Sequence, residues 1–147
     1  MKKISKIVVL FCGVVGLVSV VYTTALADQC PKASEIKYNS QTGVYVGPDG
    51  WQATYKTGTN KIHRFYDVQL TNDMSPGSTV ATSAQCTYAL KPLSLGYLPL
   101  TQAGQHHYKH IGPNWHPMSP PPEPNIGYMC GPPVSDPASC LFKVGAP

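Results

Sequence analysis

Charged residues are scarce in this 147-residue sequence, where they make up only 12% of the chain. Average soluble domains carry ~25% charged residues. Such a low content argues against a solvated helical bundle, a coiled coil or an acidic disordered tail. No segment repeats apolar residues at helical spacing beyond two turns, so a largely helical fold is also disfavoured. The length suits a single domain.

The sequence also lacks the common catalytic motifs. It contains no Gly-x-Ser-x-Gly and no His-Glu-x-x-His pattern. Glu35 and Glu123 are its only glutamates, and nothing marks a pair of carboxyl groups ~5–9 Å apart of the kind that glycosidases use. We therefore predict a protein that is not an enzyme. A small secreted hydrolase without a recognisable motif is an alternative.

The first 27 residues have the layout of a secretory signal peptide. Three lysines precede an uncharged apolar run, residues 7–21, and Ala25-Leu26-Ala27 supplies a small-x-small cleavage site. The run is shorter than the ~20 residues that a membrane-spanning helix needs. We expect residues 1–27 to direct the chain to the export machinery and to be removed, leaving a secreted or periplasmic protein with no membrane partner. An uncleaved N-terminal anchor is the alternative.

Removal of this segment changes the charge balance. The formal net charge of the whole chain is +4. Lys2, Lys3 and Lys6 leave with the signal, so eight basic residues remain against seven acidic ones, a net charge of +1. The remaining basic residues are scattered, whereas phosphate binding needs clustered Lys and Arg. We therefore expect no nucleic-acid partner.

Four cysteines remain after the signal: Cys30, Cys86, Cys130 and Cys140. An even number of cysteines in a small exported domain predicts disulfides, and four cysteines allow three connectivities. The turn-rich loop between Cys130 and Cys140 favours a bond between these two, which leaves Cys30 to pair with Cys86. A four-thiolate zinc site is the less favoured alternative, because the chain has no Cys-x-x-Cys pair.

Alternation of apolar and polar residues predicts two longer strands, at residues 62–70 and 79–90. The expected apolar face of the first comprises Ile62, Tyr66, Val68 and Leu70. The expected apolar face of the second comprises Ala84, Cys86, Tyr88 and Leu90. Turn-forming residues separate the two segments.

Shorter strands are expected at residues 36–38, 44–46 and 51–55, the last two joined by a turn at residues 47–50. Residues 93–100 favour an edge strand or a loop, because Gly96 and Pro99 interrupt them. Many short strands separated by turns predict an all-β fold, namely a small disulfide-stabilised β-sandwich or barrel-like domain.

The proline content rises after Gly112: ten of the 15 prolines lie in residues 113–147. We therefore divide the exported chain into a β-domain core, residues 28–112, and a Pro-rich segment, residues 113–147. The segment is expected to be extended and polyproline-like, to be packed on or tied to the same domain, and to end in a strand at residues 140–144. A ligand for an aromatic groove is the less favoured interpretation of its prolines.

Four histidines cluster near the end of the core: His106, His107, His110 and His116. Imidazole is a common ligand of copper and zinc, so a periplasmic metal-binding protein is one alternative function. Adjacent histidines on a strand would point to opposite faces, which favours a polar surface loop instead. We otherwise expect no cofactor.

Aromatic residues offer a second candidate site, formed by Trp51, Trp115 and Tyr108. Exposed Trp and Tyr suit recognition of a protein or a glycan, because they combine an apolar face with a polar group. The favoured alternative is that most aromatic residues form the core. The preferred function is an exported, non-enzymatic binding domain for a protein or glycan at the envelope or outside the cell, which includes secreted host-interaction factors.

Five short motifs span nearly all of the exported chain: Cys30-Pro31, Gly43-Val44-Tyr45, Gly50-Trp51, Cys86-Thr87-Tyr88 and Cys140-Leu141-Phe142. In these motifs the chain resembles a family of small exported bacterial proteins, the domain of unknown function DUF3757. The resemblance implies a secreted or periplasmic, disulfide-bonded β-domain. It brings no catalytic residues to this sequence, and it covers neither the Pro-rich segment nor the histidine cluster.

Overall fold

The computed structural model describes residues 27–55, 61–71, 80–119 and 126–145. The signal peptide predicted at residues 1–27 lies outside this part except for Ala27. Within it the chain forms β-strands and short 3-10 turns with no α-helix, which confirms the all-β prediction. No helix among these residues is long and apolar enough to cross a membrane.

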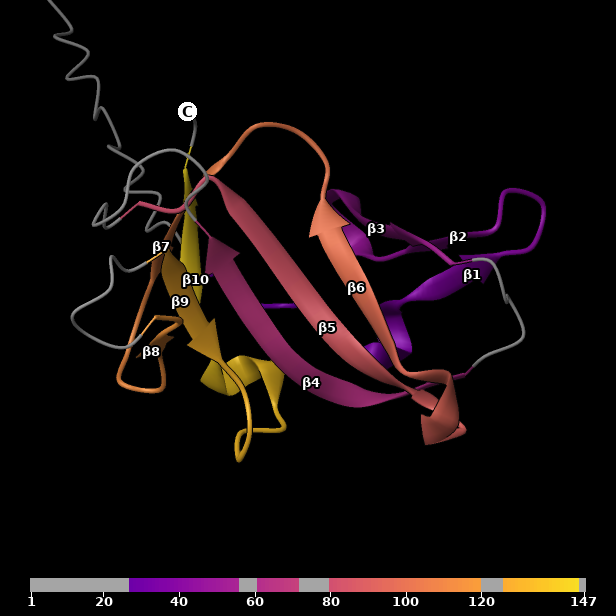
Figure 1. Cartoon of the computed structure of the whole chain (residues 1–147). Coiled ribbons are helices and arrows are strands. Elements are labelled where there is room, and N and C mark those ends of the chain that lie inside the picture. Colours follow the sequence, from indigo (N-terminus) through magenta and orange to yellow (C-terminus); the bar gives the residue numbers. More distant parts are fainter. Residues whose placement is uncertain (1–26, 56–60, 72–79, 120–125, 146–147) are drawn as a thin grey trace, which may run out of the picture.

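Eight strands form one antiparallel sheet (Figure 1). Their spatial order is β1 (Lys37–Asn39), β2 (Val44–Val46), β3 (Trp51–Thr54), β6 (Tyr97–Gln102), β5 (Ser83–Lys91), β4 (Lys61–Thr71), β9 (Gly127–Cys130) and β8 (His116–Pro117). The 3-10 turns are η1 (Ala33–Glu35), η2 (Pro48–Gly50), η3 (Leu93–Leu95) and η4 (Pro137–Ser139). The short strands expected near residues 36–38, 44–46 and 51–55 are therefore confirmed as β1 to β3.

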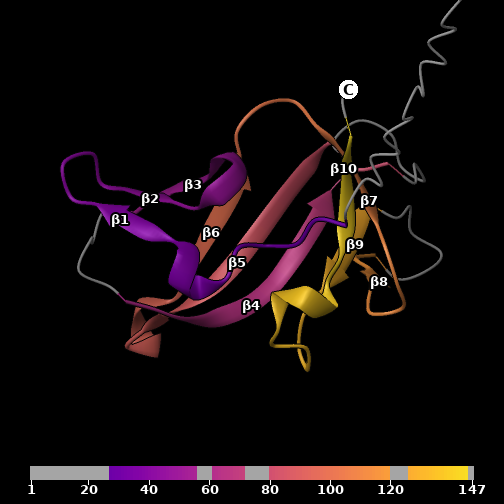
Figure 2. The same cartoon turned by 180° about the vertical axis from the view of Figure 1, so that it is seen from behind.

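A second, two-stranded sheet pairs β10 (Phe142–Gly145) with β7 (His107–His110). Single bridges extend it on both sides, because Asp28 pairs with Phe142 and Ala81 pairs with Tyr108. Figure 2 shows the N-terminal segment leaving β10 and crossing the long strands on its way to η1. The face that it crosses is the inner face of the large sheet, and Figure 1 looks onto the opposite, outer face.

The core lies between the inner face of the large sheet and the small sheet. Strand β5 supplies the residues predicted for its apolar face, all of them buried: Ala84, Cys86, Tyr88 and Leu90. From the small sheet, the Phe142 ring packs edge-on against Trp51 at 6.4 Å and against Tyr108 at 6.1 Å between ring centroids. The two sheets therefore share one hydrophobic core.

Strand β4 departs from regular alternation. Its register against β5 shifts between Ile62 and Arg64 and again between Phe65 and Asp67, which indicates β-bulges. A bulge adds one unpaired residue and reverses the side on which the following side chains lie. The prediction that Tyr66 shares the inner face with Val68 is wrong for this reason, since Phe65 is the buried residue there.

The expectation of an edge strand or loop at residues 93–100 is confirmed for that stretch: residues 93–95 form η3, and residues 97–100 pair only with β5. Only the end of β6 lies between β3 and β5. Proline is rare in central strands because it cannot donate a backbone hydrogen bond. Here β3 pairs only with Thr101 and Gln102, whereas Pro99 pairs only with Thr87 of β5. Pro99 is tolerated because its stretch of β6 has a partner strand on one side only.

Both favoured disulfides are confirmed. Cys30 bonds to Cys86 with 5.8 Å between Cα atoms, and Cys130 bonds to Cys140 with 5.7 Å. The first bond ties the N-terminal segment to β5, and the second closes the loop between β9 and η4. All four cysteines are fully buried.

Candidate functional site

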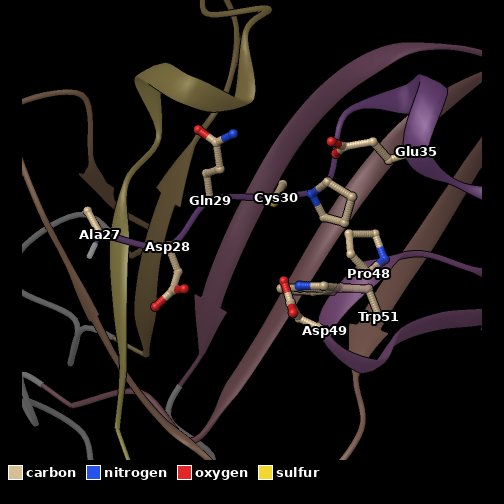
Figure 3. Close-up of a pocket in the computed structure, with 9 residues that line it drawn as sticks. Ala27, Asp28, Gln29, Cys30, Glu35, Pro48, Asp49 and Trp51 are labelled. Atoms are coloured by element: carbon tan, nitrogen blue, oxygen red, sulfur yellow. The ribbon is translucent and has the colours of Figure 1, made fainter. Parts of the chain in front are cut away.

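A cleft of about 550 Å³ opens between the N-terminal segment and the turn that joins β2 to β3 (Figure 3). We call it the N-terminal cleft. Its lining residues are Ala27, Asp28, Gln29, Cys30, Pro31, Glu35, Pro48, Asp49 and Trp51. They come from two segments that are separate in the sequence, so the cleft depends on how both segments are held.

The first wall is the N-terminal segment, which is fixed at two points. Asp28 exchanges backbone hydrogen bonds of 2.7 and 3.0 Å with Phe142, and its carboxylate accepts one of 3.2 Å from the Val144 N–H. Two residues further on, the disulfide between Cys30 and Cys86 joins the segment to β5. Asp28 is thereby positioned by β10 rather than by its neighbours in sequence.

The second wall is the turn between β2 and β3, which the sequence predicts at residues 47–50. Asp49 and Gly50 both adopt left-handed conformations, with φ of 53° and 80°. The Trp51 N–H donates to the Pro48 carbonyl, which closes a tight hairpin turn around this Asp-Gly pair. The Gln102 side chain donates to the Asp49 carbonyl at 2.9 Å. The turn is therefore held on both sides, and Asp49 lies at the cleft (Figure 3).

The cleft is acidic with one aromatic wall. Asp28, Glu35 and Asp49 contribute three carboxylates, and no lining residue is basic. Signal removal before Asp28 would add one α-ammonium group, which leaves an excess of negative charge. Trp51 is only 3% exposed, but its indole reaches the cleft. Carboxylates and an indole together favour a group that is cationic and partly apolar.

A shallower hollow of about 360 Å³ lies next to the cleft. It is lined by Lys37, Val46 and Gly47, and it shares Glu35 and Pro48 with the cleft. Val46 is among the exposed large apolar residues. The cleft therefore offers acidic side chains, and the hollow beside it offers an apolar surface.

Two of the three candidate binding aromatics are not available as exposed surfaces. Trp115 is buried and donates its indole N–H to the Leu141 carbonyl at 3.0 Å. Tyr108 is buried and donates its hydroxyl to the Gln102 side chain at 3.2 Å. Both belong to the core, as the alternative interpretation of the aromatics expects. Trp51 also packs in the core, but it keeps one side towards the N-terminal cleft.

The four candidate metal-ligating histidines lie in different surroundings. A ring nitrogen of His106 is 3.0 Å from the Ala103 carbonyl, and the His110 ring lies 4.2 Å from the Tyr128 ring between centroids. His107 and His116 are exposed on β7 and β8. Across the part of the chain that is described, no three His, Cys, Asp or Glu side chains are placed to hold a metal ion. Copper or zinc binding stays a prediction from the sequence.

His110 predicts a pH dependence of stability. Burial and the charge of Lys109 lower the pKa of His110 below its ordinary value of 6.5. The unfolded chain therefore binds a proton more readily below pH 6.5, so the free energy of unfolding should fall as the pH drops from 7 towards 5. Urea unfolding across this range should show a flatter pH dependence for His110→Gln than for the wild type. The control Thr101→Gln changes an exposed residue without removing a titratable group and should keep the wild-type slope. An unchanged slope in His110→Gln would contradict the assignment.

Comparison with protein-family models, curated proteins and solved structures finds no match to this chain. The resemblance to DUF3757 proteins therefore stays a prediction. Function must be inferred from the site. The sequence indicates Trp51 as a candidate binding residue but not the carboxylates around it. The turn at Asp49-Gly50 is the one local pattern that points to a carboxylate at this site.

Proposed function

We propose that the chain is an exported, non-enzymatic binding domain whose N-terminal cleft receives a cationic side chain of a partner protein. The observation that carries this proposal is the composition of the cleft, which combines three carboxylates with an indole and no basic side chain. A lysine or arginine side chain has a charged head and an apolar stem, so it suits both parts of the lining.

Export is supported by the two disulfides, which form and persist in oxidising compartments. The signal-peptide layout of residues 1–27 points in the same direction. Binding without catalysis is supported by the oxidised state of the four cysteines at residues 30, 86, 130 and 140, because a disulfide-bonded cysteine is no thiolate nucleophile.

The apolar hollow beside the cleft specifies the partner further. Val46 and Pro48 line it, and Glu35 lies at its border with the cleft. A peptide that alternates a basic residue with an apolar one would place a cation near Asp49 and an apolar side chain near Val46. Because exposed charges are screened by salt, binding should weaken as the ionic strength rises.

The test uses protein recovered from the periplasm or medium of an expressing bacterium, with its N-terminus determined by mass spectrometry. The probe is an acetylated, amidated peptide of alternating lysine and leucine, and the readout is the NMR signal of the Trp51 indole N–H. We expect an N-terminus at Asp28 and a saturable shift of this signal. The double variant Glu35→Gln/Asp49→Asn should weaken binding at least tenfold.

Two controls make the result specific. Asp136→Asn removes an exposed carboxylate outside the cleft, and its side chain can still cap η4, so it should bind like the wild type. A peptide with glutamate in place of lysine should not bind. Equal binding of both peptides, or an unchanged affinity in the double variant, would refute the cleft as a cation site, and retention of the protein in the cytoplasm would refute export.

A further inference from the structure

Three basic side chains lie at one end of the outer face of the large sheet, where β4 begins and β5 ends (Figure 1). Lys61 and Lys91 are both exposed and are directly opposite each other in the ladder between these strands. Arg64 is also exposed, and it pairs with Ala89, which lies two residues before Lys91 and therefore on the same face. Like charges opposite each other destabilise a sheet. The lysine pair therefore costs stability unless an anion lies against it.

The strands that carry this cluster offer it no accessible carboxylate. Asp67 is the one acidic residue in β4, β5 and β6, three strands that the structure describes from end to end. Its side chain is only 4% exposed, and the Gln69 amide donates to its Oδ2 atom at 3.3 Å. The adjoining turn η3 contains no acidic residue either. The exposed charge at this end of the face is therefore positive, which favours an anionic ligand.

A pair of tyrosines borders the basic cluster on the same face. The rings of Tyr66 on β4 and Tyr97 on β6 have centroids 4.5 Å apart, with 46° between their planes. Their side chains hydrogen-bond, which raises the pKa of Tyr66, and the nearby charge of Arg64 acts in the opposite direction. Tyr97 is 50% exposed, and it pairs with the same Ala89 that pairs with Arg64. An aromatic and a basic side chain thus flank one small residue.

The second bulge of β4 brings Tyr66 to this surface. Phe65 is buried in the core, whereas Asp67 pairs with Thr87 on the outer face. Tyr66 is the extra residue between them, so its ring lies across β5 against Tyr97. Bulges are frequent beside binding sites, where they re-aim a side chain. The bulge therefore adds a second aromatic ring next to the basic cluster.

We propose that Lys61, Arg64, Tyr66, Lys91 and Tyr97 form a binding site for a polysaccharide of uronate sugars, a role beyond that of the N-terminal cleft. We call this surface the basic-aromatic patch. A uronate ring has an apolar C–H face, which suits the exposed ring of Tyr97. The same sugar carries a carboxylate, which suits the lysines and the guanidinium group of Arg64. The patch lies on an open sheet face, so a chain of linked sugars can continue beyond it in both directions.

Other ligands fit the basic-aromatic patch less well. A nucleic acid gains its affinity from many phosphate contacts, whereas the patch contains three cations. Single-stranded nucleic acids also stack successive bases on aromatic faces, and here the two tyrosine rings lie against each other. A neutral glycan would leave the lysine pair without an opposite charge. A uronate sugar supplies both the ring and the charge.

The test measures binding of the exported protein to end-labelled oligomers of galacturonate, mannuronate and guluronate by fluorescence anisotropy. Two comparison ligands of equal length carry the same label. Methyl-esterified galacturonate keeps the sugar rings but loses their charge, and single-stranded DNA keeps the charge without pyranose rings. We expect saturable binding of at least one uronate oligomer, and weaker binding of the methyl ester and of the DNA.

Two pairs of lysines separate the patch from general charge attraction. Lys61→Gln/Lys91→Gln should weaken uronate binding at least tenfold. Lys109 and Lys143 are also exposed and directly opposite each other, but they lie between β7 and β10 on the small sheet. Lys109→Gln/Lys143→Gln changes the net charge by the same amount, so it should bind like the wild type. Equal losses in the two double variants would overturn the proposal.

The aromatic ring is tested separately. Tyr97→Ala should weaken binding at least tenfold, whereas Tyr97→Phe should bind nearly as well as the wild type because the ring is kept. Near-ultraviolet circular dichroism verifies that Tyr97→Ala is folded, and wild-type binding by this folded variant would contradict the proposed stacking.

The remaining outcomes concern the ligand and the independence of the two sites. Binding of no uronate oligomer, equal binding of the methyl ester, or equal or tighter binding of the DNA would each refute the uronate site. Glu35→Gln/Asp49→Asn should lose the lysine peptide but keep the uronate oligomer. The N-terminal cleft is therefore judged by its own test, whatever the result at the basic-aromatic patch.

Discussion

Replacing Cys30 and Cys86 together by alanine is expected to lower the free energy of unfolding by about 4 kcal/mol. The two cysteines are 56 residues apart, and their bond removes the entropy of a long loop from the unfolded chain. Chemical denaturation of the purified variant and the wild type, both in oxidising buffer, measures the difference. The N-terminal segment would also lose its anchor on β5, so the lysine peptide should bind more weakly to this variant.

The second disulfide provides a matched control. Cys130 and Cys140 are only 10 residues apart, so the same chain-entropy argument gives about 3 kcal/mol for their joint replacement by alanine. All four cysteines are fully buried, which makes the two variants comparable in packing. A larger loss from the short loop than from the long one would contradict the entropic explanation of the difference.

Phe142→Ala is expected to cost about 3–5 kcal/mol, the range found when a buried phenylalanine is removed from a core. Phe142 is 1% exposed, and its ring contacts Trp51 of the large sheet and Tyr108 of the small one. Its loss leaves a cavity at the junction of the two sheets. Thermal unfolding followed by near-ultraviolet circular dichroism should show a lower midpoint.

Lys143, the next residue on β10, provides a control variant for Phe142→Ala. Lys143 is exposed on β10, and Lys143→Ala should change the free energy of unfolding by less than about 0.5 kcal/mol. If Phe142→Ala were as mild as Lys143→Ala, the small sheet would not share the core of the large one. The cleft variant Glu35→Gln/Asp49→Asn changes two exposed side chains, so it should keep the wild-type stability that Phe142→Ala loses.

Local patterns in the sequence predicted β5 well, because alternation over residues 83–91 keeps a single register from end to end. The same reasoning failed in β4, where two bulges place Phe65 in the core and Tyr66 on the outer face. For residues 93–100 it succeeded, but the pairing of Thr101 and Gln102 with β3, which makes β6 an interior strand at its end, was not foreseen. Bulges and strand lengths are set by the partner strand, and a single segment carries little information about them.

The candidate sites show the same difference between features that a local pattern predicts and features that depend on distant segments. The Asp49-Gly50 turn was expected from its residues, because few other pairs adopt two successive left-handed conformations. Asp28, however, is held at the cleft by backbone hydrogen bonds to Phe142 and by a hydrogen bond from the Val144 N–H of β10, 116 residues away, to its carboxylate. No local sequence pattern could have predicted that the two walls of the N-terminal cleft lie next to each other.

By itself, the sequence determined the all-β class and favoured the two disulfides that the structure contains. These properties depend on composition and on spacing over a few residues. The tertiary structure alone decided that Trp115 and Tyr108 are buried, that Trp51 faces a cleft, and that Tyr66 and Tyr97 meet on the outer face. The physical reason is that exposure of a side chain depends on which strands pair across the sheet, and that pairing joins residues far apart in the chain.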